Sequence, residues 1–259
     1  MEPILKVTDL SKAFSRAGRD TFFAVDHVSF EVQPGEILGI VGESGSGKST
    51  IARLITRQID ATGGQIFIDG QDITRLRGRD LIPVYAKIQM VFQSPADSFD
   101  PRRTLGDDIC ESLRNKGVPK AEREAKARAL LESCGLPATF LARYPHQVSG
   151  GQCQRAAIAR ALMNDPRILI FDEATSNIDV ESENEIMTQI HRLAKSKTVI
   201  LISHRLANVA DADNIYVMDG GSVVESGSHR ALVGRGGAYA KLWNAQQELE
   251  SYAKGGEEE

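Results

Sequence analysis

The hydrophobic and polar positions of this 259-residue chain form two kinds of segment that alternate along the sequence. Short apolar runs with almost no charge are typical of central strands in a parallel sheet, which are buried on both faces. Segments with apolar residues three or four positions apart are typical of helices that bury one face. Their alternation predicts an α/β fold with a largely parallel sheet. The apolar runs are residues 37–41, 88–92, 168–171 and 199–202.

The first seventy residues follow a different pattern. Residues 3–9 and 22–32 are predicted strands, and in the second one Ala24, Val28, Phe30 and Val32 share one parity and therefore one face. Residues 65–70 form a further predicted strand that ends in an Asp-Gly turn. These pieces predict a small antiparallel sheet beside the main one.

The middle of the chain is predicted to be helical. Residues 95–163 show helical periodicity and no convincing strand, and residues 120–134 place Ala127, Leu130, Leu131 and Cys134 on one stripe. A mostly helical insertion therefore interrupts the α/β core. Near the end, residues 219–222 (Asp-Gly-Gly-Ser) predict a hairpin turn, and an amphipathic helix follows at 238–249 before a Gly-Gly-Glu-Glu-Glu tail typical of disorder.

Composition narrows the class of protein. Hydrophobic residues make up 41% of the chain and charged residues 25%, as in ordinary soluble proteins with a core. The net charge is −4, and the tail alone holds Glu257, Glu258 and Glu259, so no basic field indicates nucleic-acid binding. No run of about 18 apolar residues predicts a transmembrane helix, and the start lacks the pattern of a signal peptide. The scattered Cys110, Cys134 and Cys153 form no metal or disulfide pattern and favour a reducing compartment.

A glycine-rich loop follows the first apolar run and matches the phosphate-loop pattern GxxxxGK[ST]. Glycines let the backbone N–H groups surround an anion, and the helix predicted at 49–57 adds its positive end. Lys48 would reach the β- and γ-phosphates, and the Ser49 hydroxyl would ligate Mg²⁺. A chance Gly/Ser-rich turn is the alternative, and the flanking strand and helix argue against it. The predicted nucleotide-binding residues are Gly42, Glu43, Ser44, Gly45, Ser46, Gly47, Lys48, Ser49 and Thr50.

Two adjacent carboxylates, Asp172 and Glu173, end the apolar run at 168–171. Ligands of open α/β sheets gather at the carboxyl ends of the strands, so Asp172 is placed to hold Mg²⁺ and Glu173 to polarise the attacking water as a general base. The alternative is that the two acids simply stand at a helix N-terminus, where negative charge is favourable. The presence of a phosphate loop in the same chain favours the Mg²⁺ and general-base interpretation over this alternative.

Between these two motifs the string Val148-Ser149-Gly150-Gly151-Gln152 precedes a predicted helix at 152–163. In this order the motifs resemble the nucleotide-binding subunit of ATP-binding cassette (ABC) transporters, whose signature is usually written LSGGQ. The resemblance covers residues 3–249. It implies a P-loop NTPase (RecA-like) core with an N-terminal antiparallel β subdomain and an inserted α-helical subdomain. The implied single ABC domain comprises a core at 1–93 and 164–235, a helical subdomain at 94–163, and a C-terminal helix and acidic tail at 236–259.

The resemblance assigns further roles residue by residue. Gln93 is similar to the glutamine that senses Mg²⁺ and the attacking water, and His204 to the switch histidine that contacts the γ-phosphate. Asp179 stands in the D-loop, where it would communicate across a dimer interface. Phe14 is the favoured residue for stacking on adenine, with Phe22 and Phe23 as competitors that begin a strand and are alternatively core. The sequence departs mildly from the family pattern at Val148, where the family usually has Leu, and at Asn177 in the D-loop. These departures leave open a dimer whose two ATP sites differ in strength.

The resemblance also implies cofactors, partners and location. ATP and Mg²⁺ are expected, with each ATP completed by Ser149, Gly150, Gly151 and Gln152 of a second ABC subunit, identical or different. Two separate transmembrane permease subunits, and an extracytoplasmic solute-binding protein, would place the chain at the cytoplasmic face of the cell membrane.

The direction of transport has competing indications. Residues 92–102 are similar to the oligopeptide, dipeptide and nickel importer branch, which favours import of peptides, nickel or similar solutes. Residues 202–213, 224–229 and 237–246 resemble ABC exporters, so an exporter is the alternative. A soluble ABC ATPase that transports nothing is the third possibility.

Overall fold

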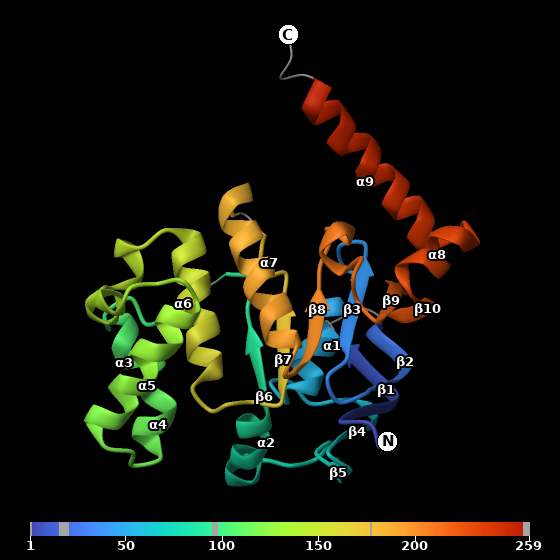
Figure 1. The fold of residues 1–259 in the computed structure, drawn as a ribbon. Coiled ribbons are helices and arrows are strands. Elements are labelled where there is room, and N and C mark those ends of the chain that lie inside the picture. The colour runs from blue at the N-terminus through green and yellow to red at the C-terminus, as the bar shows by residue number, and fades with distance from the viewer. Residues whose placement is uncertain (1, 16–20, 95–97, 177, 256–259) are drawn as a thin grey trace. The chain divides into compact units, whose positions relative to one another are not determined.

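The computed structural model describes residues 2–15, 21–94, 98–176 and 178–255 (Figure 1). The chain divides into two compact units: unit 1 comprises residues 1–77 and 200–259, and unit 2 comprises residues 78–199. The importer-like residues 95–97, the D-loop Asn177 and the glutamates of the acidic tail lie outside the described residues.

Unit 1 begins with the predicted antiparallel sheet, which has four strands in the order β2-β1-β4-β5. The hairpin between β4 and β5 turns at Asp69 and Gly70, with φ of 50° and 73°, which confirms the Asp-Gly turn. The strands are β1 (Leu5–Phe14), β2 (Phe22–Val32), β4 (Gly63–Ile68) and β5 (Gln71–Asp72).

The predicted buried face of β2 is partly wrong. Val28, Phe30 and Val32 are buried as expected, but Val25 is fully buried in place of Ala24, which is only half-buried. The pairing of β1 with β2 shifts register here, and His27 has a φ of 51°. An irregularity of this kind adds a residue to one strand and moves the following side chains to the other face.

The second sheet of unit 1 carries strands in the order β10-β9-β3-β8. β3 and β9 pair in parallel, while β9 and β10 form the predicted antiparallel hairpin through Gly220 and Gly221, with φ of 53° and 88°. The strands are β3 (Ile37–Gly42), β8 (Thr198–Ile202, which spans the unit boundary), β9 (Asn214–Asp219) and β10 (Ser222–Gly227).

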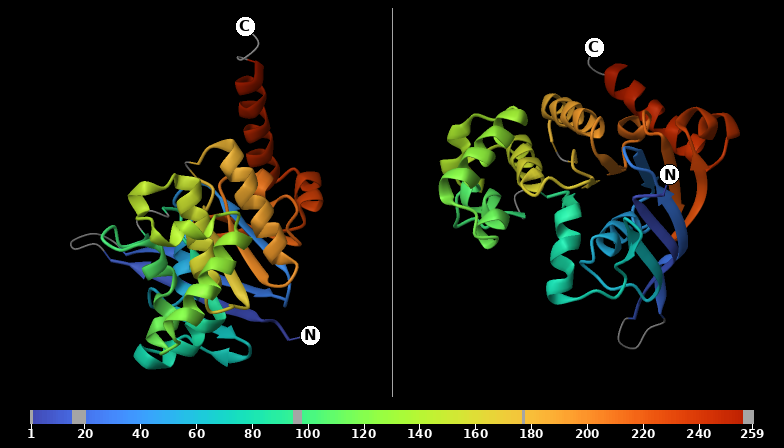
Figure 2. Two further views of the ribbon diagram at one scale, coloured as in Figure 1. Left: turned by 60° about the vertical axis from the view of Figure 1, so that its left-hand side comes forward. Right: turned by 60° about the horizontal axis from the view of Figure 1, so that its bottom comes forward.

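Four helical segments complete the described part of unit 1. The predicted phosphate-loop helix is present, and so is the C-terminal helix, which extends away from the strands of its own unit (Figures 1 and 2). The segments are α1 (Lys48–Ile55), the 3-10 helix η5 (Leu206–Val209), α8 (His229–Arg235) and α9 (Ala238–Gly255).

Unit 2 combines two parallel strands with helices. β6 (Ile88–Val91) pairs with β7 (Ile168–Asp172). In the described residues between them every regular element is helical, which confirms the helical insertion, and helices α3 to α6 gather together in both views of Figure 2. The α-helices are α2 (Ile82–Lys87), α3 (Leu105–Ile109), α4 (Glu111–Asn115), α5 (Lys120–Ser133), α6 (Gly150–Leu162) and α7 (Val180–Ala194). The 3-10 helices are η1 (Gly78–Leu81), η3 (Ala138–Ala142) and η4 (Pro145–Gln147).

The stripe predicted for α5 is largely confirmed, because Ala127, Leu131 and the following Cys134 are buried while Leu130 is half-buried. Within the described ranges, no helix is both long enough and apolar enough to cross a membrane.

Candidate nucleotide-binding site

The phosphate loop lies in unit 1 between β3 and α1, where neighbouring backbone demands glycine. A Cβ atom on Gly42 would lie 2.2 Å from the Met218 carbonyl oxygen, and one on Gly47 would lie 2.1 Å from that of Ala24. Gly45 has open space around it but a φ of 81°, which also favours glycine. The tip residues Glu43 and Ser44 are exposed. The loop is therefore fixed at its base and accessible at its tip.

The end of this loop suits an anion. Gly47 is the N-cap of α1 and offers no side-chain cap, and the first turn of the helix contains no acidic residue. The N–H groups that begin a helix then present their partial positive charge outward. The buried Ser46 hydroxyl has no hydrogen-bond partner among the residues that the structure describes. This donor set fits a phosphate group.

Lys48 brings a buried cation to the same loop. It is only 5% exposed, and its Nζ donates hydrogen bonds to the carbonyl oxygens of Gly42 at 2.9 Å and Glu43 at 2.7 Å. Ser49 and Thr50 follow in the first turn of α1 and are half-buried. The structure thus gathers the predicted residues 42–50 into one loop and helix start.

The three candidate aromatic residues lie at the ends of β1 and β2 that face residues 16–20 in the sequence. Phe14, Phe22 and Phe23 are 38%, 48% and 47% exposed, so the alternative that Phe22 and Phe23 are core residues is wrong. The rings of Phe14 and Phe22 stack with centroids 5.8 Å apart, and Lys12 Nζ lies 5.1 Å from the centre of the Phe14 ring. Stacking of Phe14 on adenine stays a prediction.

His204 follows β8 in unit 1 and is exposed. The preceding residue, Ser203, holds the turn: its Oγ accepts a hydrogen bond from Arg205 N at 3.0 Å and donates one to Arg205 O. Gln246 on α9 adds two further hydrogen bonds around His204, from its Nε2 to His204 O and from Leu206 N to its Oε1. Sequence reasoning missed Gln246, because a glutamine on an amphipathic helix carries no signal of what it contacts.

In unit 2, two predicted catalytic residues meet although they lie far apart in the sequence. Gln93 Nε2 donates a hydrogen bond to Glu173 Oε2 at 2.8 Å. Glu173 has a φ of 49°, a left-handed conformation that is uncommon for residues other than glycine. Asp172 is the last residue of β7 and is 5% exposed. Gln154 was also missed: it is fully buried on α6, and its Nε2 bonds to Phe92 O, next to Gln93.

The signature residues open α6. Ser149 is the N-cap: its Oγ accepts a hydrogen bond from Gln152 N at 3.3 Å, and Gln152 Oε1 accepts one from Ser149 N at 3.1 Å. This reciprocal pair is a capping box, which fixes where a helix begins. Gly150 has open space around it, whereas a Cβ atom on Gly151 would lie 2.5 Å from the side chain of Ser182 on α7.

Asp179 caps α7. Its Oδ1 accepts a hydrogen bond from Ser182 N at 2.8 Å, and bonds from Ser182 hold the pKa of Asp179 below its usual value. Since Ser182 also packs on Gly151, the D-loop residue and the signature helix adjoin within unit 2.

The predicted Mg²⁺ ligands are a hydroxyl, an amide and a carboxylate: Ser49, Gln93 and Asp172. Such oxygen donors fit Mg²⁺, which keeps several waters and uses few protein ligands. The described part of the chain contains no group of three or more His, Cys, Asp or Glu residues that could hold a metal ion.

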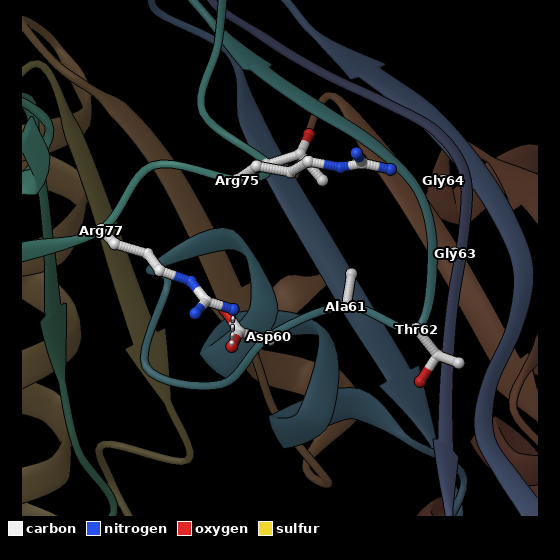
Figure 3. A pocket seen from close by; sticks show the side chains of 8 residues that line it. Asp60, Ala61, Thr62, Gly63, Gly64, Arg75 and Arg77 are labelled. Carbon is white, nitrogen blue, oxygen red and sulfur yellow. Dashed lines mark hydrogen bonds and ion pairs between the residues drawn. The ribbon is translucent and has the colours of Figure 1, made fainter.

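A cavity of about 370 Å³ elsewhere in unit 1 contains none of these residues (Figure 3). Asp60 lines it and pairs with Arg77 at 3.5 Å and with the buried Arg57 at 2.7 Å. The Arg57 hydrogen bond holds the pKa of Asp60 below its usual value. The remaining lining residues are Ala61, Thr62, Gly63, Gly64, Thr74 and Arg75.

A phosphate loop between a strand and a helix, together with an acidic pair at the end of a parallel strand, defines a P-loop nucleotide-binding α/β protein. The family model of ABC transporters matches residues 25–176. This chain belongs to that family.

The two relatives of this chain described next are named as ATP-binding proteins of import systems. The glutathione import ATP-binding protein GsiA of Escherichia coli O157:H7 is 41% identical over 242 residues, which cover 89% of this chain and 39% of GsiA. The chain thus spans about two fifths of the length of GsiA. A putative peptide import ATP-binding protein of Brucella ovis is 39% identical over 237 residues, covering 90% of this chain and 74% of that protein.

Solved structures confirm the fold class. The ATP-binding cassette MJ0796, in a dimeric post-hydrolysis state bound to ADP and Pi, has a TM-score of 0.81 and 30% identity, and the match covers 87% of this chain and 99% of that one. A bacterial Atm1-family ABC exporter with ATP bound has a TM-score of 0.77 and 35% identity, covering 95% of this chain and 42% of that one. The α/β cassette with its antiparallel sheet and helical insertion is as predicted.

Proposed function

We propose that this chain is the ATP-hydrolysing subunit of an ABC transporter that imports peptides, nickel or similar small solutes through separate membrane subunits. The observation that carries the ATPase assignment is the 2.8 Å hydrogen bond from Gln93 to Glu173. It joins two residues, distant in sequence, that the resemblance assigns to the attacking water.

In the proposed mechanism of ATP hydrolysis, each predicted site residue has a separate role. The loop amides and Lys48 bind the β- and γ-phosphates, and Phe14 stacks on the adenine. Glu173 polarises the attacking water, with Gln93 orienting its carboxylate, and His204 contacts the γ-phosphate. Ser49, Gln93 and Asp172 would hold Mg²⁺, which neutralises charge on the transferred phosphoryl group.

The complete site needs a second ABC subunit, identical or different. The capping box of Ser149 and Gln152 leaves the start of α6 well ordered, and this helix end would donate to the γ-phosphate of ATP bound by the partner. ATP then links the two subunits, and its hydrolysis releases them. The ATP-binding cassette MJ0796 is dimeric.

Two permease subunits in the membrane and an extracytoplasmic solute-binding protein complete the proposed importer, with the chain at the cytoplasmic face of the membrane. Import is supported by the names of GsiA and the Brucella ovis protein. Export is the second candidate, favoured by 35% identity to an Atm1-family exporter and by the exporter-like residues 237–246. Neighbouring genes for two multi-span proteins and a secreted binding protein would favour import.

The variant Glu173→Gln tests the ATPase assignment. Glutamine fills the same space but is not a base, so we expect ATP turnover to fall by at least about 100-fold while ATP binding persists. The trapped nucleotide should also hold two subunits together. Phosphate release measures the turnover, and light scattering after size-exclusion chromatography in ATP measures the dimer.

Glu132→Gln is the matched control, because Glu132 is exposed on α5 and removal of its charge leaves the site intact. Its turnover should equal that of the wild type. Near-normal hydrolysis by Glu173→Gln would show that Glu173 is not the base.

A further inference from the structure

The C-terminal helix α9 is fixed to unit 1 at its first turn. Both carboxylate oxygens of Glu225 on β10 accept hydrogen bonds from the start of α9, one from Ala238 N at 2.7 Å and one from Tyr239 N at 3.1 Å. Gly237 leaves the room for this contact, since a Cβ atom there would lie 1.7 Å from Glu225 Oε1. A carboxylate at a helix N-terminus also complements the helix dipole. The start of α9 therefore has a defined position.

An aromatic cluster fixes how α9 is rotated about its axis. Tyr239 is fully buried, and its hydroxyl lies 2.8 Å from His229 Nδ1 on α8. The ring of Trp243, one turn further along α9, meets that of His229 edge to face with centroids 4.5 Å apart. Residues three and four apart share a helix face, so this cluster also determines where Gln246 points.

Gln246 uses both ends of its amide on the segment that carries His204. Its Oε1 accepts a hydrogen bond from Leu206 N at 2.9 Å, and its Nε2 donates one to His204 O. A primary amide holds a donor and an acceptor in one plane, which matches a backbone C=O and N–H two residues apart. The two bonds hold the backbone on both sides of Arg205, and the Ser203 hydroxyl bonds to the backbone of Arg205 as well.

We propose that Gln246 is a positioning residue for His204, through which α9 sets the geometry of the segment that contacts the γ-phosphate. The inference rests on the role of His204 in the proposed function. Misplacing a group by about 1 Å can cost up to about 100-fold in rate, so a residue that touches no nucleotide can still govern turnover.

The test compares Gln246→Ala with Gln247→Ala in the full chain. Gln247 is the next residue on α9 and is exposed, so it controls for any effect of shortening a glutamine on this helix. We expect Gln246→Ala to lower kcat for ATP hydrolysis about tenfold, with KM for ATP within about twofold of the wild type, and Gln247→Ala to change neither. Gln246→Glu keeps the acceptor for Leu206 N but loses the donor, and should lower kcat as well.

A double variant separates positioning from a general loss of structure. If Gln246 acts through His204, then His204→Ala combined with Gln246→Ala should be no slower than His204→Ala alone, because residues that act as a unit are not additive. The melting temperature of Gln246→Ala should stay within about 2 °C of the wild type, which corresponds to less than about 1 kcal/mol for a chain of this size.

Each other outcome overturns the inference in a recognisable way. If His204→Ala hydrolyses ATP slowly while Gln246→Ala has the kcat of the wild type, then Gln246 does not position His204. The proposed function is unaffected by that result. A further tenfold loss in the double variant shows that Gln246 acts elsewhere. A fully active His204→Ala removes the proposed role of His204, and the inference with it.

Discussion

At the scale of single residues, the two adjacent glycines of the signature differ in what surrounds them. A Cβ atom on Gly150 would have nothing within 4 Å, whereas one on Gly151 would meet the Ser182 side chain at 2.5 Å. We therefore expect Gly151→Ala to lower the free energy of unfolding by about 1–3 kcal/mol, as overpacking does. Urea denaturation followed by circular dichroism measures this loss.

Gly150→Ala is the matched control and should be at least as stable as the wild type, since alanine favours a helix over glycine. Ser182→Gly removes the atoms that the new methyl group would meet. The combination of Gly151→Ala with Ser182→Gly should then cost less than the two single changes together. Equal losses at Gly150 and Gly151 would contradict the packing argument.

Single residues also show where sequence reasoning stops. The positions of Lys48 in the phosphate loop and of Glu173 directly after β7 could be predicted, because each residue stands in a motif with fixed spacing after an apolar strand. Gln154 and Gln246 could not, because each acts on backbone atoms about 40 or more residues away. A side chain that bonds to a carbonyl oxygen or an amide imposes no pattern on the sequence of its partner.

At the scale of elements, helices α5 and α6 place two thiols in buried positions. Cys134 follows α5 and Cys153 lies on α6, and burial raises the pKa of each from 9.0 to about 11. Between about pH 9 and 11 the unfolded chain loses these protons while the folded chain keeps them. The unfolded state then binds fewer protons, so the free energy of unfolding falls as the pH rises through this range.

Cys134→Ala and Cys153→Ala should each make this fall shallower, even where alanine lowers stability at pH 8. Urea midpoints at pH 8, 9, 10 and 11 give the slopes for the wild type and the variants. The three thiols are buried, so they should also react slowly with a thiol reagent at pH 8 until urea unfolds the chain. Parallel pH profiles for all variants would contradict the raised pKa values.

The elements themselves were largely predictable. Strand β2 begins and ends at the predicted residues, and the hairpin turns at Gly70 and Gly220 follow from their positive φ. The buried face of β2 could not be predicted. The strand is irregular at His27, which has a positive φ, and a histidine in the sequence does not indicate a bulge. A prediction from period-two alternation assumes a regular strand, and one inserted residue moves all the following side chains to the opposite face.

At the scale of the whole molecule, the order of the motifs predicted the family. Lys48 and His204 belong to unit 1, whereas Gln93, Asp172 and Glu173 belong to unit 2. Hydrophobic patterning marks the elements and says little about which of them form one compact body, since that depends on contacts between distant segments.

Binding at the proposed ATP site should raise the stability of the folded chain. A ligand that binds only the folded chain stabilises it by about 2.7 kcal/mol at 100 times its Kd. For a chain of this size we expect ATP with Mg²⁺ to raise the melting temperature by about 5–10 °C. Lys48→Ala should remove the shift and a chelator of Mg²⁺ should reduce it, while Lys241→Ala, at an exposed position of α9, should keep it.

Hydrogen exchange tells which unit the nucleotide stabilises. Because the proposed function assigns ATP contacts to α1 and to the end of β7, amides in both elements should exchange more slowly with ATP and Mg²⁺. Glu173→Gln is the form to use, since we expect it to bind ATP and to hydrolyse it so slowly that the ligand persists. Protection confined to unit 1 would separate nucleotide binding from Asp172 and Glu173, and the catalytic base would have to be sought elsewhere.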